Sequence, residues 1–172
     1  MDDHRRWSPC DVGHSSLMPL MQPHQRRWIE GNLLDHDIPF VVIGGVAVKF
    51  YCPARETSDI DLFVGSDPAT IARLVAAIPK LAADPDAKAK LLDWRVGHFT
   101  VEQPHQIDVL SFAPGLEIDE AVRTSEMVEI EGVPIPILSL TLLIAHKLAV
   151  NEFKDLEDVR LLQAVEQGDR LT

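Results

Sequence analysis

The sequence predicts an α/β domain with a mixed, twisted sheet that carries polar side chains on one face and is flanked by helices, the C-terminal ones closing over that face. Short apolar runs typical of strands alternate with segments of helical spacing along most of the chain. The chain has 172 residues, which suits one domain with a substantial core. Its hydrophobic content of 46% and charged content of 25% are ordinary for a globular protein.

The chain divides into an extension and one domain. Residues 1–25 are polar and show no sustained period, so we expect a flexible N-terminal extension. Residues 26–172 form the predicted domain, with a core over about 38–137 and C-terminal helices over about 139–166. No internal repeat or low-complexity tract interrupts it.

The first half of the domain alternates helices and strands. Apolar spacing predicts a helix over about 25–36, which Asp37 and Pro39 end. A strand over 40–43 turns at Gly44 and Gly45 into a short helix over 46–51. A second strand covers 60–64, a helix follows with Asp67 as its N-cap, and a short helix or loop runs on to about residue 92.

The second half contains two pairs of strands, with a short helix between them. We expect strands over 98–102 and 106–112, a short helix over 119–123, and a hairpin of strands 126–130 and 133–137 around Glu131 and Gly132. Two helices then run over about 139–151 and 154–166, the first capped by Ser139. The residues Trp28, Trp94 and the phenylalanines are expected in the core.

Two carboxylates stand out in the second strand. Residues two apart on a strand point the same way, so Asp59 and Asp61 share one face while Ile60 and Leu62 share the other. Like charges side by side are unfavourable unless a cation compensates, and oxygen ligands suit Mg²⁺. The alternative is that Asp59 is a polar residue at the strand start and Asp61 an exposed edge carboxylate.

A glycine pair precedes these carboxylates. Gly44 and Gly45 end the first strand, where small residues let the backbone approach a phosphate at a helix N-terminus. The alternative is a tight turn between strand and helix. Taken with the carboxylates, the pair indicates metal-assisted chemistry on a nucleotide.

This arrangement resembles the nucleotidyltransferase superfamily of the DNA polymerase beta type. The motif is an apolar residue and Gly-Gly, then Asp-x-Asp between apolar residues, with a third carboxylate on a later strand. Here it reads Ile43-Gly44-Gly45, Asp59-Ile60-Asp61 and Asp108. The resemblance implies that Asp59, Asp61 and Asp108 are catalytic and bind Mg²⁺ (or Mn²⁺), and that the enzyme transfers a nucleoside monophosphate from an NTP to an acceptor hydroxyl.

Further blocks are similar to small prokaryotic members, including the AbiEii-type toxins, over about residues 38–165. They are Arg55-x-Thr57-x-Asp59, Leu143 to Leu148, and Lys154-Asp155-Leu156-Glu157-Asp158, with Glu152-Phe153 where the family often has Arg. The resemblance implies a possible toxin and a tRNA end, a protein or a small molecule as acceptor. The expected nucleotide-binding residues are Gly44, Gly45, Arg55, Thr57, Ser58, Lys147 and Lys154. The alternative function is a non-catalytic binding or toxin–antitoxin interaction module, and the short chain favours a protein partner.

Three basic residues each allow two interpretations. Lys147 lies seven residues after Leu140, on the apolar side of its helix, so its ammonium meets a carboxylate or a phosphate unless it snorkels to water. Arg55 could pair with phosphate or acceptor, or with Glu56 or an aspartate. Lys154 belongs to the site or to a solvated helix start that includes Asp155.

Charge and composition exclude several classes. The net charge is −11, which argues against extended DNA binding but not against a local basic pocket. Cys10 and Cys52 form no zinc or disulfide pattern, so we expect a reducing cytoplasm, and no apolar run is long enough for a membrane span. The seven histidines show no ligand spacing.

Overall fold

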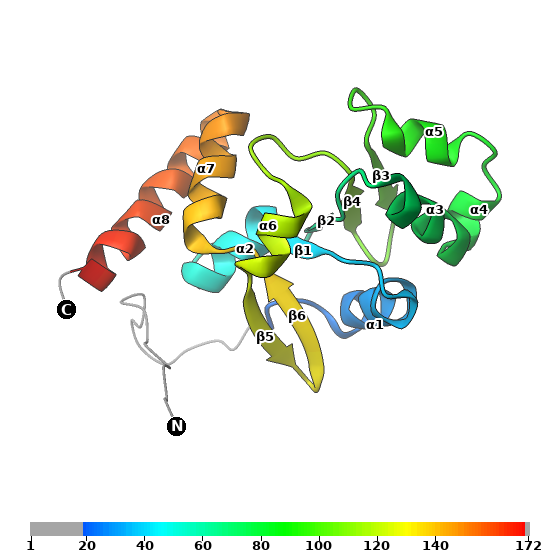
Figure 1. The fold of residues 1–172 in the computed structure, drawn as a ribbon. Helices are drawn as coiled ribbons and strands as arrows, with labels where there is room; N and C mark the ends of the chain where they lie inside the picture. The colour runs from blue at the N-terminus through cyan, green and yellow to red at the C-terminus, as the bar shows by residue number, and fades with distance from the viewer. Residues whose placement is uncertain (1–18, 171–172) are drawn as a thin grey trace.

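The computed structural model describes residues 19–170, and the side chains of residues 19–168. Its centre is a six-stranded sheet in the order β3-β4-β2-β1-β6-β5 (Figure 1). The strands are β1 (Val41–Ile43), β2 (Ile60–Phe63), β3 (His98–Val101), β4 (Ile107–Leu110), β5 (Glu126–Ile130) and β6 (Val133–Ile137). The pairs β2–β4 and β1–β6 are parallel and the other three are antiparallel, which confirms the predicted mixed sheet.

Most of the helices form two groups. They are α1 (Pro23–Asn32), α2 (Gly44–Tyr51), α3 (Pro68–Ala77), α4 (Pro79–Ala82), α5 (Ala87–Leu92), α6 (Ile118–Arg123), α7 (Leu140–Val150) and α8 (Phe153–Arg170), with a 3-10 turn, η1 (Leu34–His36), after α1. Helices α7 and α8 pack together and against α2 at one end, while α3, α4 and α5 lie together near β3 and β4 (Figure 1).

Helix boundaries follow local chemistry. The Asp67 carboxylate accepts a hydrogen bond from the backbone N–H of Thr70 at 2.8 Å, and Pro68 opens α3 as predicted. Pro79 begins α4, a separate turn that the apolar spacing does not reveal. Ser139 stands at the N-cap of α7 but makes no side-chain capping bond.

The core lies on the face of the sheet opposite the carboxylates. Ile60, Leu62, Ile107 and Val109 are fully buried there, in one cluster with the apolar sides of α1 and α3. The expectation for the aromatic residues is wrong at Trp94, which is 73% exposed, and at Phe153, which is 80% exposed. The period of a strand or helix does not apply to Trp94, because it lies in a loop.

The N-terminal boundary lies slightly earlier than expected. Residues 1–18 of the predicted extension lie outside the described residues, and α1 begins at Pro23. Gln25 is buried and its amide donates to the carbonyl oxygens of Ser58 and His105, both at 2.9 Å. Among the helices of the described region, none is both long and apolar enough to cross a membrane.

Candidate functional site

The strand register brings the predicted carboxylates together. Asp61 on β2 and Asp108 on β4 are direct partners in the parallel pair, so both side chains leave the same face of the sheet. Asp59 lies two residues before Asp61 on that face. All three line one cavity of about 480 Å³, and β1, the α2 N-terminus, α7 and α8 supply the other walls.

The charges in this cavity are crowded. The pKa of Asp61 is raised from 3.8 to about 6. Burial is the largest cause, and the neighbouring Asp108 and Asp59 raise it further, while Lys147 and Lys154 act in the opposite direction. A carboxylate in this position gains from any cation that enters the cavity.

The glycine pair packs closely against the carboxylate strand. Gly44 has a φ of +66°, and a Cβ built on it would lie 2.0 Å from Asp61 Oδ2. A Cβ on Gly45 would lie 2.7 Å from Thr57 Oγ1. Any side chain here would therefore displace Asp61 or Thr57, so both glycines are needed for the shape of the cavity.

Hydroxyl groups orient the two outer carboxylates. Thr100 on β3 donates to Asp108 Oδ1 at 2.5 Å. Ser58 donates to Asp59 Oδ1 at 3.2 Å, and the Thr57 hydroxyl lies 3.4 Å from the Asp59 carbonyl oxygen. Thr100 was not identified from the sequence, because only the pairing of β3 with β4 places it opposite Asp108.

Lys147 meets carboxylates inside the fold. Its ammonium donates to Asp155 Oδ1 at 2.7 Å and to Asp158 Oδ2 at 2.9 Å, and all three residues are buried. Burial lowers the pKa of Lys147, but the hydrogen bonds to the two carboxylates outweigh burial, so the pKa is raised. Of the two anions considered from the sequence, the structure shows a carboxylate.

Arg55 extends the same network. Its Nε lies 2.9 Å from Asp158 Oδ1 and its Nη1 donates to the Glu56 carbonyl oxygen at 2.6 Å. Burial raises the pKa of Asp158, yet the bonds from Arg55 and Lys147 prevail and hold it below its usual value. Asp155 and Asp158 are thus not part of a solvated helix start. Their spacing of three residues is the sequence signal that both face Lys147.

One carboxylate oxygen of this network makes no hydrogen bond to the described residues. Asp155 lines the cavity, and its Oδ2 is buried without a hydrogen-bond partner among the described residues. Lys154, at the cavity rim, is exposed and lies 3.4 Å from Glu152 Oε2. Hence Glu152 gives the rim a negative charge beside Lys154.

His146 is a wall residue that sequence reasoning did not assign to the site. It is buried, and its Nδ1 lies 2.7 Å from the Pro114 carbonyl oxygen, so Nδ1 carries the proton. Burial lowers its pKa, which keeps the ring neutral. Adjacent residues on a helix point in different directions. The sequence therefore did not predict that His146 lines the cavity together with Lys147.

The donor set of the three aspartates fits a hard divalent cation. They offer only oxygen ligands on one face of the sheet, and Mg²⁺ completes its shell with water and substrate phosphates. Within the described part of the chain, no three His, Cys, Asp or Glu side chains are already gathered tightly enough to hold a metal ion.

One known protein family matches most of the chain. The sequence model of a family described as "Nucleotidyl transferase AbiEii toxin, Type IV TA system" matches residues 31–171. No curated protein matches the chain.

Among solved structures, the chain is similar to an antigenic nucleotidyltransferase-like protein from Paracoccidioides brasiliensis, with 15% identity and a TM-score of 0.47, over 83% of this chain and 77% of that one. It is also similar to the Megavirus polyadenylate synthase, with 15% identity and a TM-score of 0.45, over 85% of this chain and 33% of that one.

The family match spans every wall of the cavity. It includes the glycine pair, the carboxylates of β2 and β4, and the buried network between α7 and α8. Because it covers well over half of the sequence, the chain belongs to the AbiEii nucleotidyl transferase toxin family.

Proposed function

We propose that the protein is an Mg²⁺-dependent nucleotidyltransferase that moves a nucleoside monophosphate from an NTP to an acceptor hydroxyl. The observation that carries this proposal is the single cavity in which Asp59, Asp61 and Asp108 face the glycine pair. Mn²⁺ is expected to replace Mg²⁺, since both accept oxygen ligands.

The residues have separate tasks in this reaction. Asp59, Asp61 and Asp108 would hold the divalent cation, which supplies charge neutralisation at the triphosphate. Gly44 and Gly45 admit the β- and γ-phosphates to the backbone at the start of α2.

The remaining predicted nucleotide-binding residues line the cavity or adjoin it: Arg55, Thr57, Ser58, Lys147 and Lys154. Lys154 is exposed at the rim, where its ammonium can reach a phosphate. Lys147 and Arg55 contribute positive charge behind the cavity wall while they remain paired with Asp155 and Asp158.

One bond forms and one bond breaks in the proposed transfer. A bond forms between the acceptor oxygen and the α-phosphorus, the bond from the α-phosphorus to the bridging oxygen breaks, and pyrophosphate leaves with both electrons. Asp108 would accept the acceptor's proton through Oδ2, since Thr100 bonds to Oδ1.

Binding of NTP tests this proposal most simply. Calorimetric titration with each NTP should show binding that requires Mg²⁺ or Mn²⁺, and Asp61→Asn should abolish the metal requirement together with tight binding. Asp35→Asn, at an exposed position of η1, is the matched control. Equal affinity in excess chelator would contradict the proposal and favour a non-catalytic nucleotide-binding module.

The acceptor and the cellular context are parts of the same proposal. The family description names a toxin–antitoxin system, which is the reason to test the second protein of such a system as a partner. We propose that the reaction takes place in the cytoplasm, because Cys10 and Cys52 form no disulfide pattern. Incubation with labelled NTPs and cell extract would show whether the labelled species is a tRNA, a protein or a small molecule.

A further inference from the structure

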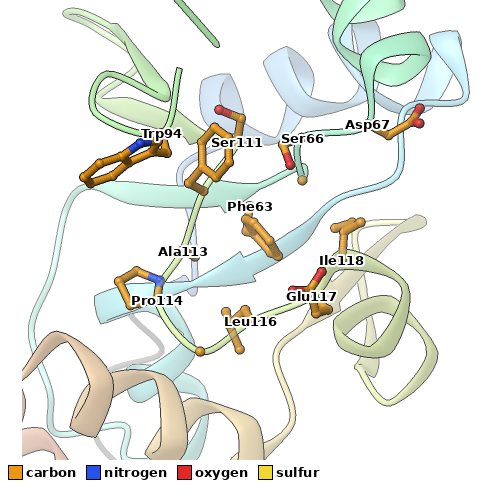
Figure 2. Close-up of a pocket in the computed structure, with 13 residues that line it drawn as sticks. Phe63, Ser66, Asp67, Trp94, Ser111, Ala113, Pro114, Leu116, Glu117 and Ile118 are labelled. Carbon is orange, nitrogen blue, oxygen red and sulfur yellow. The ribbon is translucent and has the colours of Figure 1, made fainter. Parts of the chain in front are cut away.

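A second cavity, of about 900 Å³, adjoins the carboxylate cavity. Ala113 and Pro114 line both cavities, so the two lie side by side and share a wall. The two cavities follow one another along β2 because of the two-residue period of a strand. Asp61 lines the first cavity. Phe63, two residues later on the same face, lines the second (Figure 2).

The same alternation holds on β4 and its continuation. Asp108 and Leu110 line the first cavity and Phe112 lines the second. A ligand that extends from the carboxylates along β2 and β4 therefore passes from a polar cavity into one with aromatic walls.

One wall of the second cavity carries an exposed indole. Trp94 is 73% exposed and stands above Phe63 on the side of the loop before β3 (Figure 2). The buried Ser111 hydroxyl holds this loop, because it lies 2.5 Å from the Leu91 carbonyl oxygen and 2.9 Å from that of Gly97. The loop is thus fixed before any ligand binds.

The opposite wall is fixed in a similar way. It is the segment Pro114–Ile118, which Figure 2 shows across the cavity from Trp94. His146 donates to the Pro114 carbonyl oxygen, and a Cβ built on Gly65 would lie 2.6 Å from Ile118 Cγ2. A large exposed aromatic ring that faces a second fixed wall across a cavity is typical of a ligand site rather than of a core.

The two cavities differ in their basic side chains, although carboxylates line both. The lining of the first includes Arg55, Lys147 and Lys154. The lining of the second includes no Lys, Arg or His among the described residues, but it includes Asp67 and Glu117. The second cavity therefore disfavours phosphate and suits a neutral or cationic group.

The direction of the transfer reaction relates the two cavities. The attacking and leaving oxygens lie roughly in line through the α-phosphorus. If pyrophosphate leaves at Gly44 and Gly45, beside β1, the acceptor enters from the β4 side. Ser111 and Phe112, which follow β4, lie on that side and line the second cavity.

We propose that the second cavity is the acceptor site and that the acceptor is a small hydroxyl compound with an aromatic ring and no negative charge. This proposal rests on the proposed nucleotidyl transfer for the role of the cavity, but not for its ligand chemistry. The ring stacks on the exposed Trp94 above the buried Phe63, and the positive or neutral end of the molecule lies towards Glu117.

A matched pair of probes tests the ligand chemistry. Tyramine and 3-(4-hydroxyphenyl)propionate share the ring, the hydroxyl and the two-carbon chain, but the first is cationic and the second anionic. Calorimetric titration without nucleotide should show binding of tyramine at least roughly tenfold tighter than binding of the propionate. Equal affinities, or no binding of tyramine, would overturn the proposal.

Variants locate the binding. Trp94→Ala should weaken tyramine binding roughly tenfold or more, because the stacking surface is lost. Glu117→Gln should reduce the discrimination between the two probes. Met127→Ala, which removes an exposed apolar side chain on β5 away from both cavities, should leave tyramine binding unchanged. Equal loss in the Met127 and Trp94 variants would contradict binding in the cavity.

A third probe covers the nucleic-acid acceptor. A short single-stranded RNA with a free 3′ hydroxyl should not compete with tyramine, and competition that is lost in Trp94→Ala would overturn the proposal in favour of an RNA end. The nucleotide titrations of the proposed function are independent, because the tyramine experiment contains no NTP. Tyramine binding without NTP binding would refute nucleotidyl transfer alone, and the converse would refute the acceptor site alone.

Discussion

Replacement of Asp61 by asparagine removes one of the charges that the structure crowds together between β2 and β4. The pKa of this carboxyl is raised from 3.8 to about 6, mainly by burial and then by Asp108. A difference of about two pKa units corresponds to about 3 kcal/mol, at about 1.4 kcal/mol per unit. In metal-free buffer the ionised Asp61 therefore lowers the free energy of unfolding. The Asp61→Asn variant has no charge at this position and lacks this destabilisation.

The pH dependence has a definite sign. Below about pH 3 the group is protonated in both states and contributes nothing. Between about pH 4 and pH 6 the unfolded chain has released the proton while the folded chain retains it, so the free energy of unfolding falls as the pH rises. Above pH 7 the free energy of unfolding of Asp61→Asn should exceed that of the wild type by about 2–3 kcal/mol, and near pH 3 the two should be almost equal.

Urea unfolding followed by circular dichroism, at a series of pH values in chelator, measures this difference. Asp35→Asn controls for the loss of an exposed charge. Addition of Mg²⁺ should stabilise the wild type and not the Asp61 variant, since a ligand that binds the folded state stabilises it. An Asp61 variant that is less stable than wild type at pH 8, or a difference that is constant with pH, would refute the electrostatic account.

Three further substitutions test the supporting structure. Lys147→Met should lower the free energy of unfolding by about 3–5 kcal/mol, because two buried carboxylates lose their ammonium; Lys154→Met, at the exposed rim, should change it by less than about 0.5 kcal/mol, and equal losses would disprove the buried pairing. Gly44→Ala should weaken Mg²⁺-dependent NTP binding and lower the melting temperature, since its Cβ meets Asp61 at a positive φ; wild-type values for both would show that the glycine is dispensable. Ser111→Ala should lower the urea-unfolding free energy by about 1–3 kcal/mol, as buried carbonyl groups lose a donor, and unchanged stability would contradict its role in the Trp94 loop.

Much of the fold could be predicted from local pattern. The two-residue period identified β2 and its carboxylate pair, and the N-cap Asp67 with Pro68 marked the start of α3. These features depend on residues close together in the sequence. Asp108 could be named only through family resemblance, because its position beside Asp61 depends on the parallel pairing of β2 with β4.

Contacts between distant segments account for the rest. The position of Lys147 on its helix showed that it needed an anion, but the choice of Asp155 and Asp158 over a phosphate depends on the packing of α8 against α7. The exposure of Trp94 likewise depends on how Ser111 holds the loop before β3. Aromatic composition alone favoured the core for that residue.

Nucleotidyl transfer itself is tested most directly by the position of the label that reaches an acceptor. Parallel reactions contain Mg²⁺, cell extract and an NTP labelled with ³²P at either the α- or the γ-phosphate, and Asp61→Asn serves as the inactive control. The account predicts a labelled acceptor from the α-labelled NTP only, with the γ-label recovered as pyrophosphate. Transfer of the γ-label, or no labelled product from either nucleotide, would contradict it.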